Sequence, residues 1–176
     1  MADTLVASQE TQDQDVYYVR QDGNANKYAG PQWLSASESF SVSSVIFYVW
    51  RDSVFSGNVW VEVWDDSGGA PNAKIGQSDS YSTALLGTSA AEFTFAFTTK
   101  PALTASSTYY FILNGSSNEG LIGMRGRSET TDWEIWEHST GVWLVSGPTH
   151  QAGYIKVYKT AAGGTPINIA LAVGGS

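Results

Sequence analysis

The chain has 176 residues, of which 13% are aromatic and only 15% are charged, and its net charge is −8. Frequent Val, Thr, Gly and Ser without helix-forming runs favour one all-β domain that is large enough to bury a core. The negative charge argues against a nucleic-acid partner and against docking on anionic membranes, because both need clustered Lys and Arg. No cysteine is present, which excludes disulfides, thiolate metal sites and cysteine nucleophiles.

The first residues, 1–15, are polar, and we expect them to form an N-terminal arm. They hold no basic start and no long apolar run, so we expect no secretory signal if Met1 is the natural start. No stretch of the chain reaches the length of a transmembrane helix. The short run Val16–Arg20 predicts a strand, and residues 21–30, with their Asn and Gly, predict a loop.

The segment Val45–Asp66, VIFYVWRDSVFSGNVWVEVWDD, predicts two strands joined by a short loop. Side chains alternate between the two faces of a strand, so the valines and Phe47 share one face, which we expect to be core. The other face carries four large aromatic side chains: Tyr48, Trp50, Trp60 and Trp64. Such a face can be buried by the same chain, contact a protein partner or stack on a glycan, and the sequence leaves these three readings open.

The residues Asp65–Pro71, DDSGGAP, give the strongest turn signal of the chain. Asp65 and Asp66 lie there beside Gly68 and Gly69. Their carboxylates are either turn-forming groups or oxygen ligands, so the two aspartates are candidates for binding calcium.

Further alternating runs predict the remaining strands: Gln77–Tyr81, Phe93–Phe97, Thr108–Leu113, Leu121–Arg127, a hairpin of Trp133–Trp136 with Trp143–Val145, and Tyr154–Lys159. About eight to ten short strands separated by turns predict a two-sheet antiparallel β-sandwich, jelly-roll-like, over residues 16–160. The predicted core consists of the inward-facing positions: Val45, Phe47, Val49, Val59, Val61, Val63, Phe93, Phe95, Phe97, Tyr109, Phe111 and Leu113.

Residues 161–176 form a C-terminal tail that carries no charged side chain. Four apolar residues alternate in it as they would in a strand: Ile167, Ile169, Leu171 and Val173. The tail is either a floppy end or a strand that joins a sheet edge of its own domain or of a neighbouring subunit. We expect the arm, the tail or both to contact neighbouring subunits in a homo-oligomer.

No group of residues forms a catalytic motif. His138 and His150 lie in predicted loops, without a metal-ligand pattern around them. Glu134 and Glu137 flank Trp136 with the composition of a glycosidase pair, but solvated charges on a strand face are the simpler reading. We therefore expect no enzymatic activity and no cofactor.

Several patterns follow one another in order along the chain: Ser44-Val45-x-Phe47-x-Val49 after Phe40, Gly57-x-Val59-x-Val61, the turn Asp66–Pro71, Phe93-Thr94-Phe95, Leu103-Thr104-Ala105 before Tyr109–Leu113, and Tyr154–Tyr158. Together, over residues 16–159, they resemble the choice-of-anchor R type domain. The resemblance implies a jelly-roll-like β-sandwich, similar in form to carbohydrate-binding modules, on bacterial surface and phage-associated proteins. It implies no catalytic residues.

The chain departs from the usual setting of that family, because we expect it to carry no signal peptide and no sorting or membrane anchor. A virus-encoded structural protein needs neither, since it assembles inside the host cell. We therefore expect a virion component, such as a capsid decoration, fibre or tail protein, whose partners are other virion or surface-assembly subunits. The alternative is a carbohydrate-binding or adhesion module of a bacterial surface protein, extracellular or at the cell surface, with a glycan as its partner.

Overall fold

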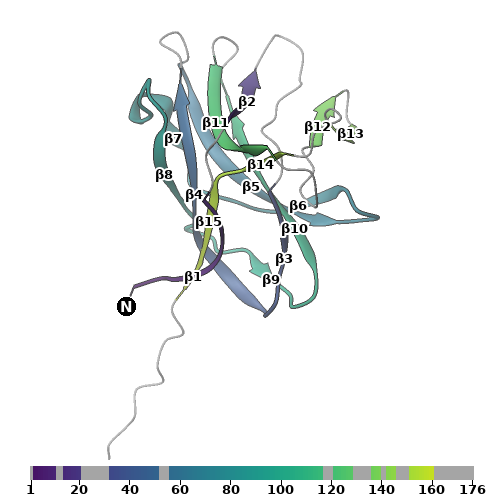
Figure 1. Ribbon diagram of the computed structural model, residues 1–176. Coiled ribbons are helices and arrows are strands. Elements are labelled where there is room, and N and C mark those ends of the chain that lie inside the picture. The colour runs from purple at the N-terminus through teal and green to yellow at the C-terminus, as the bar shows by residue number, and fades with distance from the viewer. Residues whose placement is uncertain are drawn as a thin grey trace, which may run out of the picture.

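The computed structural model describes residues 2–10, 14–20, 32–51, 56–116, 121–128, 136–139, 142–145 and 151–160. These residues are built almost entirely of antiparallel β-strands in two layers, which confirms the predicted all-β sandwich (Figure 1). The helical content of the described residues is one 3₁₀ turn, η1 (Thr83–Leu85). In this part of the chain, no helix is long and apolar enough to cross a membrane.

The larger sheet has eight strands in the order β1-β15-β4-β11-β14, with β2 beside β11 and with β8 and β9 beside β4. Its strands are β1 (Thr4–Gln9), β2 (Gln14–Arg20), β4 (Phe40–Arg51), β8 (Ala91–Ala96), β9 (Ala102–Leu103), β11 (Leu121–Ser128), β14 (Gln151–Gly153) and β15 (Ile155–Lys159). The long strand β4 pairs with β8, β9, β11 and β15, so it connects the parts of this sheet.

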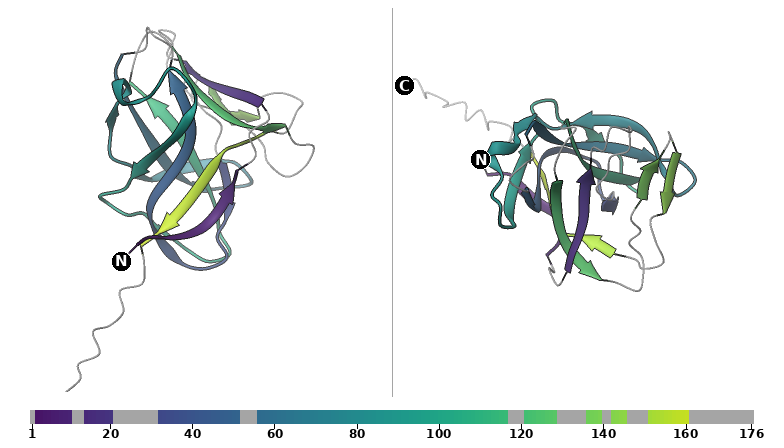
Figure 2. Two further views of the ribbon diagram at one scale, coloured as in Figure 1. Left: turned by 60° about the vertical axis from the view of Figure 1, so that its left-hand side comes forward. Right: turned by 90° about the horizontal axis from the view of Figure 1, so that it is seen from above.

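The smaller sheet has five strands in the order β3-β10-β5-β6, with β7 beside β5. Its strands are β3 (Gln32–Ser35), β5 (Asn58–Asp66), β6 (Pro71–Gln77), β7 (Tyr81–Ser82) and β10 (Thr108–Gly115). A separate antiparallel pair, β12 (Trp136–Ser139) and β13 (Val142–Val145), confirms that a hairpin forms here but corrects its first strand. The described strand is Trp136–Ser139 instead of Trp133–Trp136, so His138 lies in β12, opposite Trp143, and not in the predicted loop. Figure 2 shows the layers from two further sides.

The core lies between the inner faces of the two sheets. Every residue of the predicted core set except Phe93 is a buried member of one cluster, and Phe93 is partly buried against it. The phenylalanine rings pack edge to face, with centroids 6.2 Å apart for Phe47 and Phe95 and 5.0 Å apart for Phe93 and Phe95. The alternation in the sequence therefore identified the inward face of each of these strands correctly.

The two strands of the segment Val45–Asp66 do not form one surface, which corrects an expectation from the sequence. β4 belongs to the larger sheet and β5 to the smaller one, so the chain crosses between the layers after β4. Tyr48 and Trp50 alternate with buried residues of β4, and Trp60 and Trp64 alternate with buried residues of β5. The four aromatic side chains thus point outward on opposite sides of the sandwich. Period-two alternation fixes faces within a strand, but it says nothing about which sheet the strand joins.

Part of the expected N-terminal arm is a strand of the domain itself. β1 pairs with β15, in a register that runs from Thr4 opposite Lys159 to Gln9 opposite Ile155. Val6 and Ala7 pack against the core. A peripheral strand needs only these few apolar contacts, which is why a mostly polar sequence concealed it.

The predicted short strand at Gln77–Tyr81 is also misplaced. β6 ends at Gln77 and β7 begins at Tyr81, so the residues between them connect the two strands. β6 is the outermost strand of the smaller sheet and most of its side chains are exposed. An exposed edge strand lacks the apolar alternation by which strands are recognised.

Candidate functional site

Trp50 lies on the outer face of the larger sheet and packs against its own chain. Its cross-strand partner on β11 is Gly123, and a Cβ atom on Gly123 would lie only 2.0 Å from Cζ2 of Trp50. The indole therefore rests directly on the glycine backbone. Trp50 is half-buried, so much of its surface is used within the subunit.

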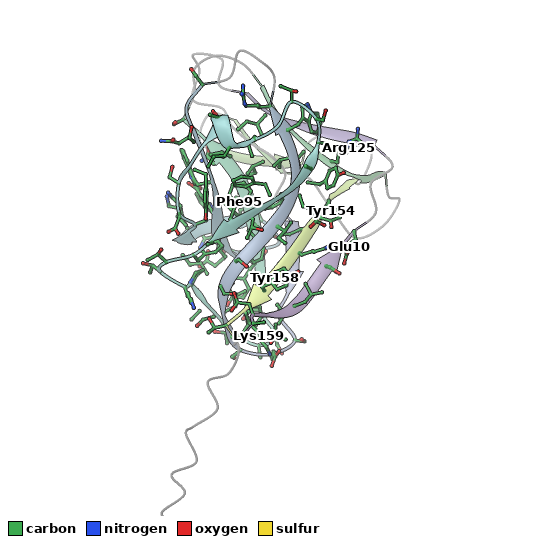
Figure 3. All side chains as sticks on the ribbon, turned by 90° about the vertical axis from the view of Figure 1, so that its left-hand side faces the viewer. Glu10, Phe95, Arg125, Tyr154, Tyr158 and Lys159 are labelled. Carbon is green, nitrogen blue, oxygen red and sulfur yellow. The ribbon has the colours of Figure 1, made fainter. Side chains whose placement is uncertain are left out.

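Tyr48, on the same face, adjoins a group that we call the Lys156 cluster: Glu10, Glu92, Tyr154 and Lys156. The ring of Tyr48 lies 5.4 Å from that of Tyr154, which is labelled with Glu10 in Figure 3. Nζ of Lys156 lies 2.9 Å from Oε1 of Glu92 and 3.2 Å from Oε2 of Glu10. The Tyr154 hydroxyl donates a hydrogen bond to Glu92. The cluster thus connects β8, β15 and the residue that follows β1.

The protonation of the Lys156 cluster follows from these contacts. Hydrogen bonds from Tyr154 and Lys156 lower the pKa of Glu92. Burial and the bond to Glu92 raise the pKa of Tyr154, and contacts with Tyr154 and Glu92 raise the pKa of Lys156. Each group is therefore held in the form that it has at neutral pH, as a structural ion pair requires.

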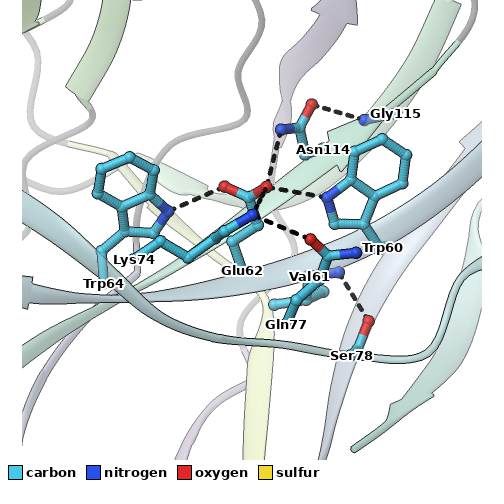
Figure 4. A network of polar contacts seen from close by, with 9 residues as sticks. All are labelled: Trp60, Val61, Glu62, Trp64, Lys74, Gln77, Ser78, Asn114 and Gly115. Atoms are coloured by element: carbon cyan, nitrogen blue, oxygen red, sulfur yellow. Dashed lines mark hydrogen bonds and ion pairs between the residues drawn. The ribbon is translucent and has the colours of Figure 1, made fainter.

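The outer face of the smaller sheet carries a carboxylate between two indoles (Figure 4). Glu62 accepts hydrogen bonds from Nε1 of Trp60 at 3.0 Å and from Nε1 of Trp64 at 2.9 Å. Nδ2 of Asn114 at 3.3 Å and Nζ of Lys74 at 3.4 Å approach the same carboxylate. We call these five residues the Glu62 cluster.

The strand register brings the Glu62 cluster together. Trp64 is opposite Lys74 of β6, and Trp60 is opposite Asn114 of β10. Glu62 is only 7% exposed, while both tryptophans are half-buried. A buried carboxylate is costly unless hydrogen-bond donors surround it, and four donors surround this one. Glu62 is therefore an anchor that fixes the orientation of the two indoles.

The rest of this face is exposed unevenly. Tyr110 and Ile112 of β10 lie outside the core cluster, yet each is only 2% exposed. Lys74 and Gln77 of β6 are exposed, and Nζ of Lys74 lies 3.1 Å from Oε1 of Gln77. The part of the face that a partner can reach therefore lies toward β6 and includes the half-buried Trp60.

Sequence reasoning overlooked Glu62, because it considered only the aromatic residues of this face as candidates for a site. The signal was nevertheless present. Glu62 lies two residues from Trp60 and two from Trp64, so all three side chains share one face of the strand. Indole N–H groups need an acceptor when they are partly buried, and the carboxylate between them is the nearest one.

The two aspartates that were candidates for binding calcium take part in the turn that they precede. Oδ1 of Asp65 accepts a hydrogen bond from the Ala73 amide at 2.7 Å. Oδ1 of Asp66 accepts one from the Tyr110 hydroxyl at 2.6 Å, and Oδ2 of Asp66 accepts one from the Gly69 amide at 3.3 Å. Among the described residues, no group of three or more His, Cys, Asp or Glu side chains could hold a metal ion. Calcium binding at this turn stays a prediction.

Several predicted positions lie outside the described part of the chain, including Glu134 and His150. For Glu137 and His138, the structure describes only the backbone, in β12. The alternating tail residues also fall outside it: Ile167, Ile169, Leu171 and Val173. The expectations about these residues stay predictions.

No protein-family model matches this chain, and a search of curated proteins finds no significant match. The resemblance to the choice-of-anchor R type domain therefore stays an expectation drawn from the order of sequence patterns.

Proposed function

We propose that this chain is a non-catalytic structural and binding protein of a virion, such as a capsid decoration, fibre or tail protein, built on a carbohydrate-binding-like β-sandwich. The Glu62 cluster is the observation that carries the binding role in this proposal, while the virion context rests on the resemblance to the choice-of-anchor R type domain. The carboxylate in it is engaged by four donors and holds two indoles in place. In our proposal, this face serves for contact rather than for chemistry.

The rigidity of the indoles supports this binding role. Aromatic side chains give large contact energies at interfaces, and a side chain that is ordered before binding loses less conformational entropy. Trp60 meets both conditions, because its indole is fixed by Glu62 and is only half-buried. A protein subunit of the same assembly is the partner that we propose for this face.

A second candidate function is glycan binding, as in an adhesion module. The observation that favours it is the mixture of groups toward β6, where an indole lies near the exposed side chains of Lys74 and Gln77. Sugars combine apolar ring faces with hydroxyl groups, so they suit an aromatic surface bordered by hydrogen-bonding groups.

Two measurements separate these functions. Antibodies against the purified chain should label intact virus particles, from the sample in which the sequence occurs, in immunogold electron microscopy. Labelling confined to cell surfaces would contradict the virion proposal. A glycan array probed with the full chain tests the second candidate, with Trp60→Ala as the loss variant. Leu85→Ala is the matched control, because Leu85 is 64% exposed and lies on η1, away from the Glu62 cluster.

A further inference from the structure

The strand β1 forms an edge of the larger sheet. Among the described strands it pairs with β15 and with no other, so one side of its backbone faces away from the sheet. The views in Figure 2 place it at the margin of the layer. Thr4 and Ser8 are exposed, and Leu5 is 45% exposed. This edge is therefore accessible to another strand.

β1 lacks most of the features that usually protect a sheet edge. Its sequence, TLVASQ, holds no charged residue, proline or glycine, although Asp3 and Glu10 flank it. The edge strand β6 differs, because it begins with Pro71, contains Lys74 and pairs with two register shifts. Charges, proline and irregular pairing discourage the addition of a further strand. β1 has one irregularity, between Leu5 and Ala7, and continues regularly to Gln9.

The end of β15 lies at the same edge. Lys159 is opposite Thr4, so β15 ends beside the start of β1. The shortest path by which the tail of the same chain reaches the free side of β1 passes around that start and then runs parallel to β1. It would then be separated from β15 by an intervening strand, whereas sequential strands are neighbours in roughly two-thirds of cases. A tail from another copy has no such restriction, and it can pair antiparallel, which is the slightly more stable arrangement.

We propose that residues 167–173 of one copy add as a strand to the free edge of β1 in a second copy. This inference rests on the proposed structural role. It joins the alternating, uncharged run from Ile167 to Val173 with an uncharged, accessible edge. The added strand gains main-chain hydrogen bonds along β1. Because each copy offers one tail and one edge, the contact is head-to-tail, and it produces rings or strings of subunits.

The first test measures assembly of the full chain by size-exclusion chromatography with light scattering over a range of concentrations. The expected result is a mass that rises above that of one chain, while a variant that lacks residues 161–176 keeps the mass of one chain and the same thermal transition. A labelled peptide of residues 161–176 should bind the truncated variant. The same peptide with Ile169→Lys and Leu171→Lys should lose binding at least tenfold.

The second test identifies the edge. Successive amides of a strand point to opposite sides, so one of Ala7→Pro and Ser8→Pro removes an amide that faces β15 and the other removes an outward amide. One of the two variants should keep the thermal transition and lose assembly. A full chain that stays monomeric, or a peptide that binds both proline variants as well as the parent, would overturn the inference. A truncated variant that unfolds would do so too, since the tail would then belong to its own domain.

These outcomes separate the inference from the proposed function. If particles carry the protein but the full chain never associates through its tail, the virion role stands and the β1 contact fails. If the tail and β1 associate but no particle is labelled, the contact stands and the virion role fails.

Discussion

Glu62 illustrates how one charged residue can organise an aromatic surface. Its oxygens accept hydrogen bonds from two indoles and an amide, and Lys74 lies 3.4 Å away. Glu62 is nearly buried. Replacing it with a residue that leaves these donors unsatisfied should therefore lower the free energy of unfolding by more than the loss of an exposed ion pair does. The position of the carboxylate thus determines both the local stability and the orientation of the surface.

We expect Glu62→Gln to destabilise the protein by about 1–3 kcal/mol, because one amide oxygen replaces two charged acceptors. Chemical denaturation measures the loss, and near-ultraviolet circular dichroism should show weaker tryptophan signals. Lys74→Ala is the control, because it removes only the half-exposed ion-pair partner and should cost about 0–1 kcal/mol. Equal effects of the two variants would contradict the anchoring role of Glu62.

Gly123 is the second residue whose identity follows from a single contact. With a Cβ atom 2.0 Å from the Trp50 indole, Gly123→Ala forces that ring to move. Overpacking of this kind costs about 1–3 kcal/mol. A double-mutant cycle tests the cause: in a Trp50→Ala background the same glycine change should cost much less, whereas an unchanged cost would place the strain elsewhere.

Among the secondary-structure elements, β8 shows that the alternation of apolar residues determines which face of a strand is buried. Phe95 is fully buried, and its ring contacts those of Phe47, Tyr81 and Phe93. We expect Phe95→Ala to cost about 3–5 kcal/mol through lost burial and a cavity. Leu85→Ala, at an exposed position, should change the free energy of unfolding by about 0.5 kcal/mol or less. A denaturation midpoint that does not move in Phe95→Ala would contradict this burial.

The sequence alone predicted which residues face inward in most strands, because burial on one side leaves a period-two pattern. It did not predict which strands pair with each other. β4 and β5 follow one another and share the same alternation, yet they lie in different sheets. Nothing in either strand encodes its neighbour, since both faces of each are largely apolar and the connection between them is short.

The candidate site was predicted only in part for the same reason, because the sequence did not reveal the strand pairing. The aromatic residues were identified individually, but their grouping on one face depended on the pairing of β4 with β5. Once the sheets are assigned, Trp50 and Tyr48 are engaged with Gly123 and Tyr154, and the Glu62 cluster remains on the opposite side. The strand β1 was missed for a different reason, because this peripheral strand makes few apolar contacts and its mostly polar segment lacks the alternation by which strands are recognised.

For the whole molecule, the Lys156 cluster connects distant parts of the chain and makes stability depend on pH. Glu92 follows the first residue of β8, Lys156 lies in β15, and Glu10 follows β1. The pKa of Glu92 is lowered in the folded protein from an ordinary value of 4.5. A carboxyl group with a lowered pKa stabilises the fold above its unfolded pKa, and this contribution is lost as the pH falls through the folded pKa.

We therefore expect the melting temperature to fall as the pH decreases below 4.5, partly because Glu92 becomes protonated. Glu92→Gln should melt at a lower temperature than the parent at pH 7, and the difference should shrink steadily as the pH falls below 4.5. Differential scanning calorimetry across this pH range measures the effect, and Asp79→Asn, at an exposed contact with Thr98, is the control. If the difference between Glu92→Gln and the parent stays constant with pH, the carboxylate does not stabilise the folded protein through its charge. The connection among β1, β8 and β15 would then depend on backbone pairing alone.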